Sequence, residues 1–189
     1  MSIRTAQKEV TRQRILGAVL DLVADGGLAE VTVPDVARAS GASVATIYRY
    51  FPTKDALFEA AAGEPARRAA GELPDGELAG GPAYLRVVWR AFAENMALVR
   101  HQLASDAGRE MRAARYQRSR EWFSDACTAR GLDPGSDAGA RVVRLALLLT
   151  SSLAFVDLHD RQGVEADAAV EDVTWAIETL VAATLEDTR

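Results

Sequence analysis

Cysteine and histidine are nearly absent from this chain of 189 residues. Cys127 is the only cysteine, which excludes an intramolecular disulfide and any multi-cysteine zinc site. We expect it to be a small buried apolar residue, with redox sensing as the remote alternative. The two histidines, His101 and His159, lie far apart and lack metal-ligand spacing. The sequence therefore predicts neither a metal nor a cofactor.

Catalytic signatures and long hydrophobic runs are also missing. The chain contains no glycine-rich dinucleotide loop, no P-loop, no zinc-protease motif and no serine-hydrolase elbow. Its longest apolar run, residues 142–158, includes Arg144 and Asp157 and falls short of a membrane span. Four cations interrupt the first fourteen residues, so no signal peptide is expected. We expect a soluble, cytoplasmic protein that is not an enzyme and has no membrane partner.

Charge is distributed unevenly along the chain. The formal net charge is -5. Residues 1–62 nevertheless carry seven basic and seven acidic residues, so the acidity belongs to the remainder. This distribution permits a nucleic-acid partner at the N-terminal part, although it does not require one.

Apolar spacing and helix breakers predict an all-α fold of about nine helices. Five glycines and three prolines in residues 63–82 predict a linker. It would divide the chain into domains at residues 1–62 and 63–189. The expected helices cover residues 6–24, 33–40, 44–50, a fourth beginning at Lys54, and then 82–103, 109–130, 137–160 and 167–186.

The second and third predicted helices form a compact unit. Thr32 and Ser43 are suited to cap them, and Gly41 lies in the turn between them. Val36 and Ile47 face each other across that turn. A short helix, a turn containing glycine and a second short helix are typical of a helix-turn-helix, whose second helix enters the DNA major groove.

The segment from Thr32 to Phe58, TVPDVARASGASVATIYRYFPTKDALF, resembles the DNA-binding domain of the TetR family of bacterial transcriptional repressors. The markers are the capped second helix, Ala-x-x-x-Gly in the turn, Tyr-x-Tyr-Phe, and Thr-Lys-x-x-Leu. The detailed similarity covers about residues 10–60. The resemblance implies an N-terminal three-helix DNA-binding domain and a C-terminal helical domain for ligand binding and dimerisation. It also implies a homodimeric repressor that leaves a palindromic operator when a small, largely apolar effector binds.

The resemblance further implies the residues that contact double-stranded operator DNA. Arg49 would reach guanine or a phosphate, whereas Val44, often polar or basic in the family, would make only apolar contacts. Thr32 is alternatively a cap alone, and Tyr50, like Phe51, alternatively packs between helices. Arg4 and Lys8 would follow the DNA backbone or form a solvated end. The full expected set is Thr32, Ser43, Val44, Ala45, Thr46, Tyr48, Arg49, Tyr50 and Lys54.

The C-terminal part offers candidates for an effector pocket and for a subunit seam. Because the predicted helix 137–160 is apolar nearly all round, a second copy of the chain is its natural cover. The expected seam contains Val156, Val173, Ile177 and Leu180. The expected pocket, which is alternatively plain core, contains Trp89, Phe92, Met96, Trp122, Phe123, Leu148 and Phe155.

Two interpretations remain open at this level. Five arginines in residues 109–120 form either a solvated helix face or a contact for an acidic ligand or partner. The rival to a DNA-binding regulator is an all-helical ligand carrier or interaction module. Such a protein would need the C-terminal pocket but not the surface between Thr32 and Lys54.

Overall fold

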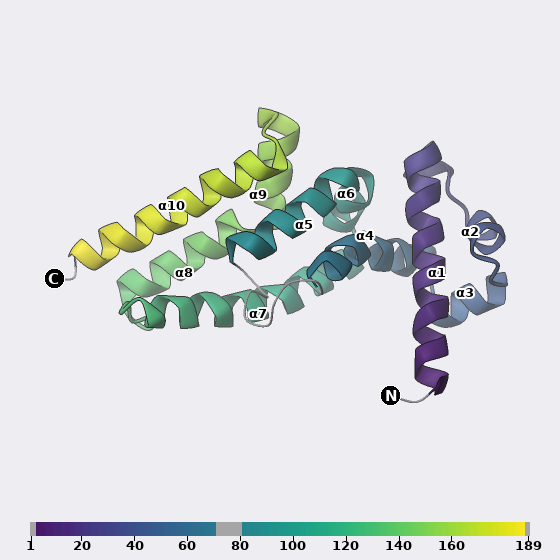
Figure 1. The fold of residues 1–189 in the computed structure, drawn as a ribbon, viewed down its shortest axis with the longest axis horizontal. Coiled ribbons are helices and arrows are strands. Elements are labelled where there is room, and N and C mark those ends of the chain that lie inside the picture. The colour runs from purple at the N-terminus through teal and green to yellow at the C-terminus, as the bar shows by residue number, and fades with distance from the viewer. Residues whose placement is uncertain (1–2, 71–80, 188–189) are drawn as a thin grey trace. The chain divides into compact units, whose positions relative to one another are not determined.

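The computed structural model describes residues 3–70 and 81–187, and within these ranges every regular element is a helix (Figure 1). The predicted all-α fold is therefore confirmed. The chain forms two compact units. The first comprises the residues up to Pro65 together with Asn95–Arg109, and the second comprises Ala66–Glu94 and the residues from Glu110 onward.

The first unit is built around the helix-turn-helix. Its helices are α1 (Ile3–Gly26), α2 (Val33–Ser40), α3 (Val44–Tyr50), most of α4 (Lys54–Ala70) and α6 (Met96–Ala104), with a 3-10 turn at Leu28–Glu30. Helices α1 to α4 share one apolar core with Leu98 of α6. The side chains in this core that are completely buried are Ile15, Leu16, Val19, Val36, Ile47, Leu57, Ala61 and Leu98.

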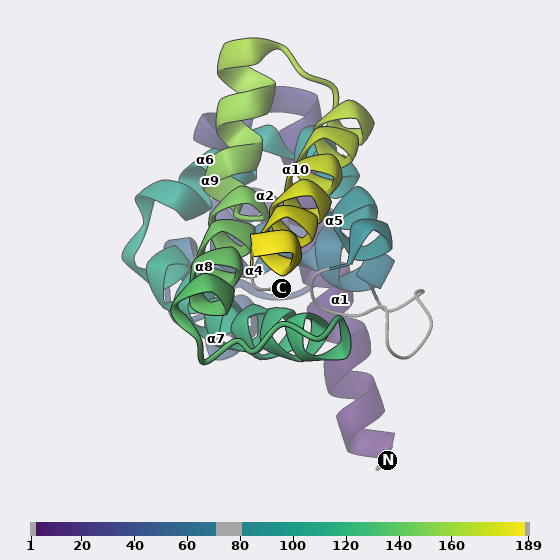
Figure 2. The ribbon, with the colours of Figure 1, turned by 90° about the vertical axis from the view of Figure 1, so that its left-hand side faces the viewer.

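The second unit is a helical bundle in which α10 (Ala166–Asp187) packs along α5 (Pro82–Glu94) and α8 (Asp137–Leu149), as Figures 1 and 2 show. Most of α7 (Asp106–Ala129) also belongs to it, as does α9 (Ser152–Val156) with a following π-helical turn at Asp157–Arg161. Trp89 and Phe92 of α5 meet Phe155 of α9, with ring centroids 5.1 and 5.9 Å apart. These three aromatic side chains are at most 2% exposed and form the centre of the unit.

The helix predicted over residues 82–103 is interrupted, and this part of the prediction was wrong. Asn95 leaves the helical conformation, with φ −130° and ψ 34°, and its carbonyl accepts bonds from the N–H groups of Leu98 and Val99. The chain therefore restarts as α6, which belongs to the first unit. Met96 consequently does not continue the face of α5 that carries Trp89 and Phe92. No glycine or proline marks this break in the sequence.

The helix predicted over residues 137–160 is also divided, and its axis bends by 48°. The hydroxyl of Thr150 donates to the carbonyl of Ala146 at 2.8 Å, and Ser151 Oγ accepts from the N–H of Ala154 to cap α9. Hydroxyl side chains thus satisfy backbone groups at the bend. Within the described ranges no single helix is long and apolar enough to cross a membrane, although this bent pair passes by length and composition.

The predicted linker begins too early. Helix α4 continues through Pro65 to Ala70. Proline is unfavourable inside a helix because it lacks an N–H and crowds the preceding turn, so sequence reasoning ended the helix before it. The remainder of the predicted linker, residues 71–80, lies outside the described residues.

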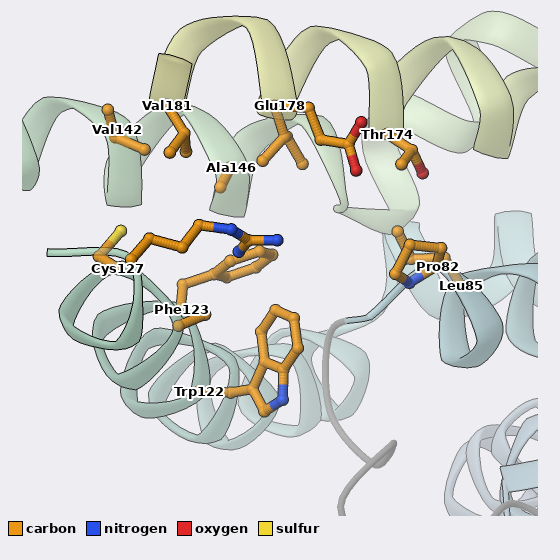
Figure 3. A pocket seen from close by; sticks show the side chains of 13 residues that line it. Pro82, Leu85, Trp122, Phe123, Cys127, Val142, Ala146, Thr174, Glu178 and Val181 are labelled. Carbon is orange, nitrogen blue, oxygen red and sulfur yellow. The ribbon is translucent and has the colours of Figure 1, made fainter. Parts of the chain in front are cut away.

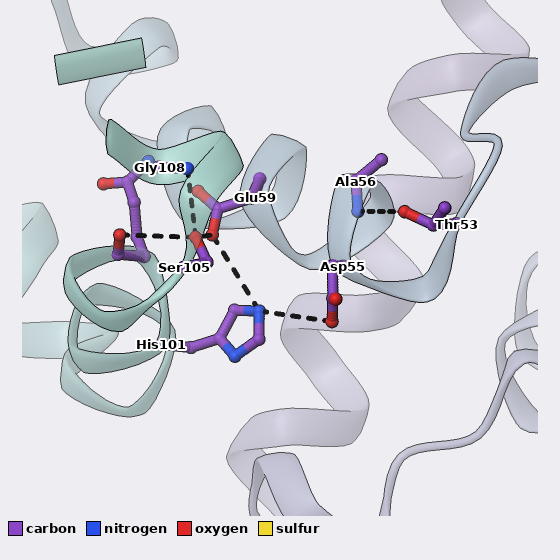
Figure 4. Close-up of polar contacts among 8 residues, drawn as sticks. Thr53, Asp55, Ala56, Glu59, His101, Ser105 and Gly108 are labelled. Carbon is purple, nitrogen blue, oxygen red and sulfur yellow. Dashed lines mark hydrogen bonds and ion pairs between the residues drawn. The ribbon is translucent and has the colours of Figure 1, made fainter. Parts of the chain in front are cut away.

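A polar cluster joins α4 to α6 within the first unit (Figure 4). Ser105 Oγ donates to the carboxylate of Glu59 and accepts from the N–H of Gly108. His101 Nε2 lies 3.9 Å from the carboxylates of both Glu59 and Asp55. The Glu59 side chain is almost completely buried. The cluster therefore holds α6 against the helix that follows the helix-turn-helix.

Candidate nucleic-acid interface

The start of α2 is organised by Thr32 and Asp35. Thr32 Oγ1 accepts from the N–H of Asp35 at 3.3 Å and donates to the Asp35 carboxylate, which also binds Arg38 at 2.5 Å. The hydrogen bond from Thr32, followed by that from Arg38, lowers the pKa of Asp35. The predicted capping role of Thr32 is confirmed, and its hydroxyl is exposed to solvent at the same time.

The turn and the start of α3 follow the chemistry expected from the sequence. Gly41 ends α2 with φ 66°, a left-handed conformation that glycine adopts without strain. Ser43 then caps α3, accepting from the N–H of Thr46 at 3.1 Å. The two hydroxyls of Ser43 and Thr46 also lie 2.9 Å apart. Both side chains are therefore engaged with their own helix.

One side of α3 is open to solvent, and the other side is core. Ile47 is completely buried against α1 and α2 side chains. The exposed side chains are Val44, Ala45, Tyr48 and Arg49, which the helical period places on one surface. We call these four residues the α3 face. It combines two small apolar groups with one phenol and one guanidinium.

The beginning of α4 adds a cation next to this surface. Thr53 Oγ1 accepts from the N–H of Ala56 at 3.0 Å and so caps the helix. Lys54 is exposed, with its ammonium 5.0 Å from the centre of the Phe58 ring. Tyr50 is half-buried. Phe51 is buried, in agreement with the interpretation that it packs between helices. Arg4 and Lys8 lie within α1, and the side chain of Arg4 is outside the described residues.

A short helix capped by Thr32, a glycine turn and a second helix with one open face make up a complete helix-turn-helix. Residues 15–61 match the model of bacterial regulatory proteins of the tetR family. This match shows the TetR family for the N-terminal part of the chain. Two curated relatives are the HTH-type transcriptional repressors KstR of Mycolicibacterium smegmatis and Mycobacterium tuberculosis, 36% and 32% identical over 102 residues. This match covers 54% of the chain and only 50% and 46% of these relatives, so the chain spans about half their length.

Solved TetR-family structures share the fold over nearly the whole chain. A TetR transcriptional regulator from Rhodococcus sp. RHA1 superimposes with a TM-score of 0.61 and 23% identity, covering 92% of this chain and 97% of that one. A putative TetR-family regulator from Syntrophomonas wolfei gives 0.64 and 18%, covering 93% and 96%. At this level of identity the likeness shows the fold alone.

Trp122 and Phe123, two of the predicted pocket residues, line a cavity of about 60 Å³ in the second unit (Figure 3). The cavity lies between α5, α7, α8 and α10, and its other walls include Leu85, Cys127 and Ile177. Thr174 Oγ1 is buried there without a hydrogen-bond partner among the described residues. Burial raises the pKa of the Cys127 thiol, which suits the predicted role of a small apolar residue.

The remaining predicted pocket residues are divided among different surroundings. Trp89 and Phe92 line a smaller cavity of about 30 Å³ and pack on Phe155. Leu148 points to solvent with 60% of its surface exposed. Met96 lies on α6 in the other unit. The structure therefore does not bring these residues together into one pocket.

The predicted seam residues are more covered than the sequence suggested. Val173 is 3% exposed within a single copy, and Ile177 lines the 60 Å³ cavity. Val156 and Leu180 are half-buried. The large apolar side chains of this region that are most open to solvent are Leu148, Leu153 and Trp175, at 60, 60 and 70%. The sequence placed Leu153 in an apolar helix without assigning it to the seam, and it missed Trp175, which lies outside the apolar face of α10.

Proposed function

We propose that this TetR-family chain is a DNA-binding transcriptional regulator that places α3 in the major groove of its operator. The observation that carries the proposal is the α3 face, which is open to solvent while Ile47 on the opposite side anchors the helix in the core. Helix-turn-helix proteins present their second helix to base edges in this way. The curated relatives that match the chain are named as repressors, which favours repression.

The chemistry of the interface suggests a division of roles. Arg49 carries the one side chain of the α3 face that can bind guanine through two hydrogen bonds. Val44 and Ala45 can contact only apolar groups such as the thymine methyl. Tyr48, Tyr50 and Lys54 are placed to contact phosphates, with Lys54 assisted by the N–H groups at the start of α4. Ser43 and Thr46 hold the helix end, and the hydroxyl hydrogen that their mutual hydrogen bond leaves free can be donated to a nearby phosphate.

We further propose that the regulator is a homodimer joined through its last helices, as the apolar character of α8 predicts. The exposed Leu148 and Trp175 would extend the seam first expected at Val156, Val173, Ile177 and Leu180. A two-fold dimer presents two copies of α3. It therefore requires a palindromic operator whose half-sites are about one DNA turn apart, roughly 34–36 Å, or a multiple of that distance.

An effector bound in the second unit would release the operator by altering the separation of the two α3 helices. Three covalent routes connect the units: α4 crosses at Pro65, α5 is joined to α6 at Asn95, and α7 crosses after Arg109. The polar cluster of Glu59, His101 and Ser105 ties α6 to α4 within the first unit. A preference of about 1–3 kcal/mol for the non-binding arrangement would lower operator affinity by roughly 5- to 150-fold.

In-vitro selection of DNA from a random library by the full chain tests this function without knowledge of the operator. We expect enrichment of an inverted repeat, and loss of enrichment when Tyr48, Arg49 and Lys54 are replaced together by alanine. Failure of the unmodified chain to enrich any sequence at low salt would contradict DNA binding. That result would favour a helical ligand carrier instead.

A further inference from the structure

Arg115 in the middle of α7 is a half-buried cation that has no acidic partner in the part of the chain that the structure describes. Its guanidinium lies 5.9 Å from the centre of the Phe92 ring. Among the described residues it forms no ion pair with a carboxylate, and the neighbouring charged or titratable groups are Tyr84, Arg112 and Arg118. Burial lowers the pKa of Arg115, and the two arginines lower it further, while Tyr84 raises it. An arginine nevertheless stays protonated, so its charge needs a counterion.

This side chain lines a cleft of about 400 Å³ between α7 and the bend from α8 to α9. Arg115, Ser119 and Thr150 line both this cleft and the 30 Å³ cavity against Trp89 and Phe92. At these three shared residues the cleft wall therefore carries a guanidinium and two hydroxyl groups. The cleft also has an apolar wall, formed by Ala113, Leu147 and Leu153, with Tyr116 beside it.

We propose that this cleft is the effector site and that its effector is an amphipathic anion, with a carboxylate or phosphate group at Arg115 and an apolar body along Leu147 and Leu153. The inference deepens the proposed regulatory function and rests on it. A planar guanidinium offers two parallel donors to such an anion. Arg112 and Ser119 line the same cleft, and the Ser119 hydroxyl can donate to the charged end, whereas the Thr150 hydroxyl donates to the carbonyl of Ala146. The 60 Å³ cavity, by contrast, is mostly apolar and lies between other residues.

The site can be tested by calorimetry on the full chain without DNA. Comparison of decanoate, decan-1-ol and inorganic phosphate as ligands separates the contribution of the anionic group from that of the alkyl chain. We expect decanoate to bind more tightly than either of the other probes. Arg115→Met should weaken decanoate binding by about tenfold to a hundredfold, the value of a hydrogen bond to a charged group, and leave decan-1-ol binding unchanged.

Two further variants keep the result interpretable. Arg115→Lys retains the charge and should bind decanoate within a few-fold of the unmodified chain. Arg118→Met removes an exposed arginine of the same helix and should change nothing. Arg115→Met should unfold at no lower urea concentration than the unmodified chain, because it removes a half-buried cation that no carboxylate of the described residues pairs with.

Several results would overturn the proposal. Equal binding of decanoate and decan-1-ol would remove the role of the charge, and equal binding of phosphate would remove the role of the apolar wall. An equal loss in Arg118→Met would show a general charge effect. A shift of Arg115→Met to monomers in sedimentation would assign Arg115 to a contact between copies. Since none of these measurements involves DNA, the failure of this site and the failure of DNA binding are distinguishable.

Discussion

At the scale of single residues, the α3 face has few groups that can distinguish one base from another. Arg49 is exposed, and its guanidinium lies 5.8 Å from the centre of the Tyr50 ring, which leaves its N–H edge available. Lys54 carries the same charge but lies at the start of α4. The two cations are thus a matched pair with different expected roles.

Replacement of each cation by alanine should separate base reading from phosphate binding. Arg49→Ala should cost about 1–3 kcal/mol of binding free energy for the selected operator and relax specificity at one position in each half-site. Lys54→Ala should weaken binding to all sequences alike and reduce the salt dependence by about one unit per subunit. Quantitative gel-shift titrations at several salt concentrations, on selected and scrambled DNA, measure both effects. Sequence-independent losses of equal size from both variants would contradict base reading by Arg49.

Asp35 makes the stability of the first unit depend on pH. Because hydrogen bonds from Thr32 and Arg38 lower its pKa in the folded chain, its carboxylate stabilises the fold above its ordinary pKa of about 3.8. This contribution is lost as the pH falls through the lower, folded value. We expect Asp35→Asn to unfold at a lower urea concentration than the unmodified chain at pH 7, and the difference to shrink by pH 3. Arg38→Gln should reduce this pH dependence, and a difference that does not change with pH would contradict the assignment.

At the scale of elements, the junction between α6 and α7 depends on a glycine. A Cβ at Gly108 would overlap the carbonyl of Gln102. The N–H of Gly108 also donates a hydrogen bond to Ser105 Oγ, and the Ser105 hydroxyl in turn donates to the carboxylate of Glu59. A larger residue at this position would therefore displace α6 from α4. The sequence does not mark this requirement, because Gly108 lies within a regular helix.

Gly108→Ala should destabilise the chain by about 1–3 kcal/mol, as is usual for overpacking. Gly17→Ala in α1 is the matched control, since a Cβ there meets nothing within 4 Å. It should stabilise the chain by about 0.5–1 kcal/mol, because alanine is the better helix former. Urea denaturation measures both. Equal effects of the two substitutions would show that the α6 junction tolerates a side chain.

At the scale of the whole molecule, the exposed indole of Trp175 is the strongest indication of a partner surface on α10. It leaves 70% of its surface in water, on a helix whose Val173 is 3% exposed. A large aromatic side chain is costly to expose and is enriched at interfaces between subunits. Trp175 therefore marks a surface of α10 that a partner copy would cover beyond the buried Val173.

Trp175→Glu should convert the dimer to monomers, because it would place a charge without a partner in an apolar seam. Sedimentation velocity at micromolar concentration measures the change. Val10→Glu is the control, since Val10 is also an exposed apolar residue, at 65%, but lies on α1 in the first unit. The proposal fails if the unmodified chain is a monomer, or if the dimer withstands Trp175→Glu.

The sequence by itself determined the helix-turn-helix, because its boundaries depend on neighbouring residues. Thr32, Ser43 and Thr53 accept hydrogen bonds from N–H groups three residues ahead, and Gly41 takes the left-handed conformation. Each of these caps and turns forms from residues within a few positions of one another, so a short stretch of sequence is enough to predict it. For the same reason, the short motif from Thr32 to Phe58 was sufficient to indicate the family.

Only the tertiary structure decided how the remaining helices are divided and which faces they bury. Asn95 breaks a predicted helix without any local breaker, and Pro65 fails to end α4. An apolar stripe such as Val173 and Ile177 is the same in sequence whether it packs on its own chain or on a partner. The cleft at Arg115 likewise depends on α7 meeting the bend between α8 and α9. Contacts between distant segments determine these features, and such contacts leave no regular spacing in the sequence.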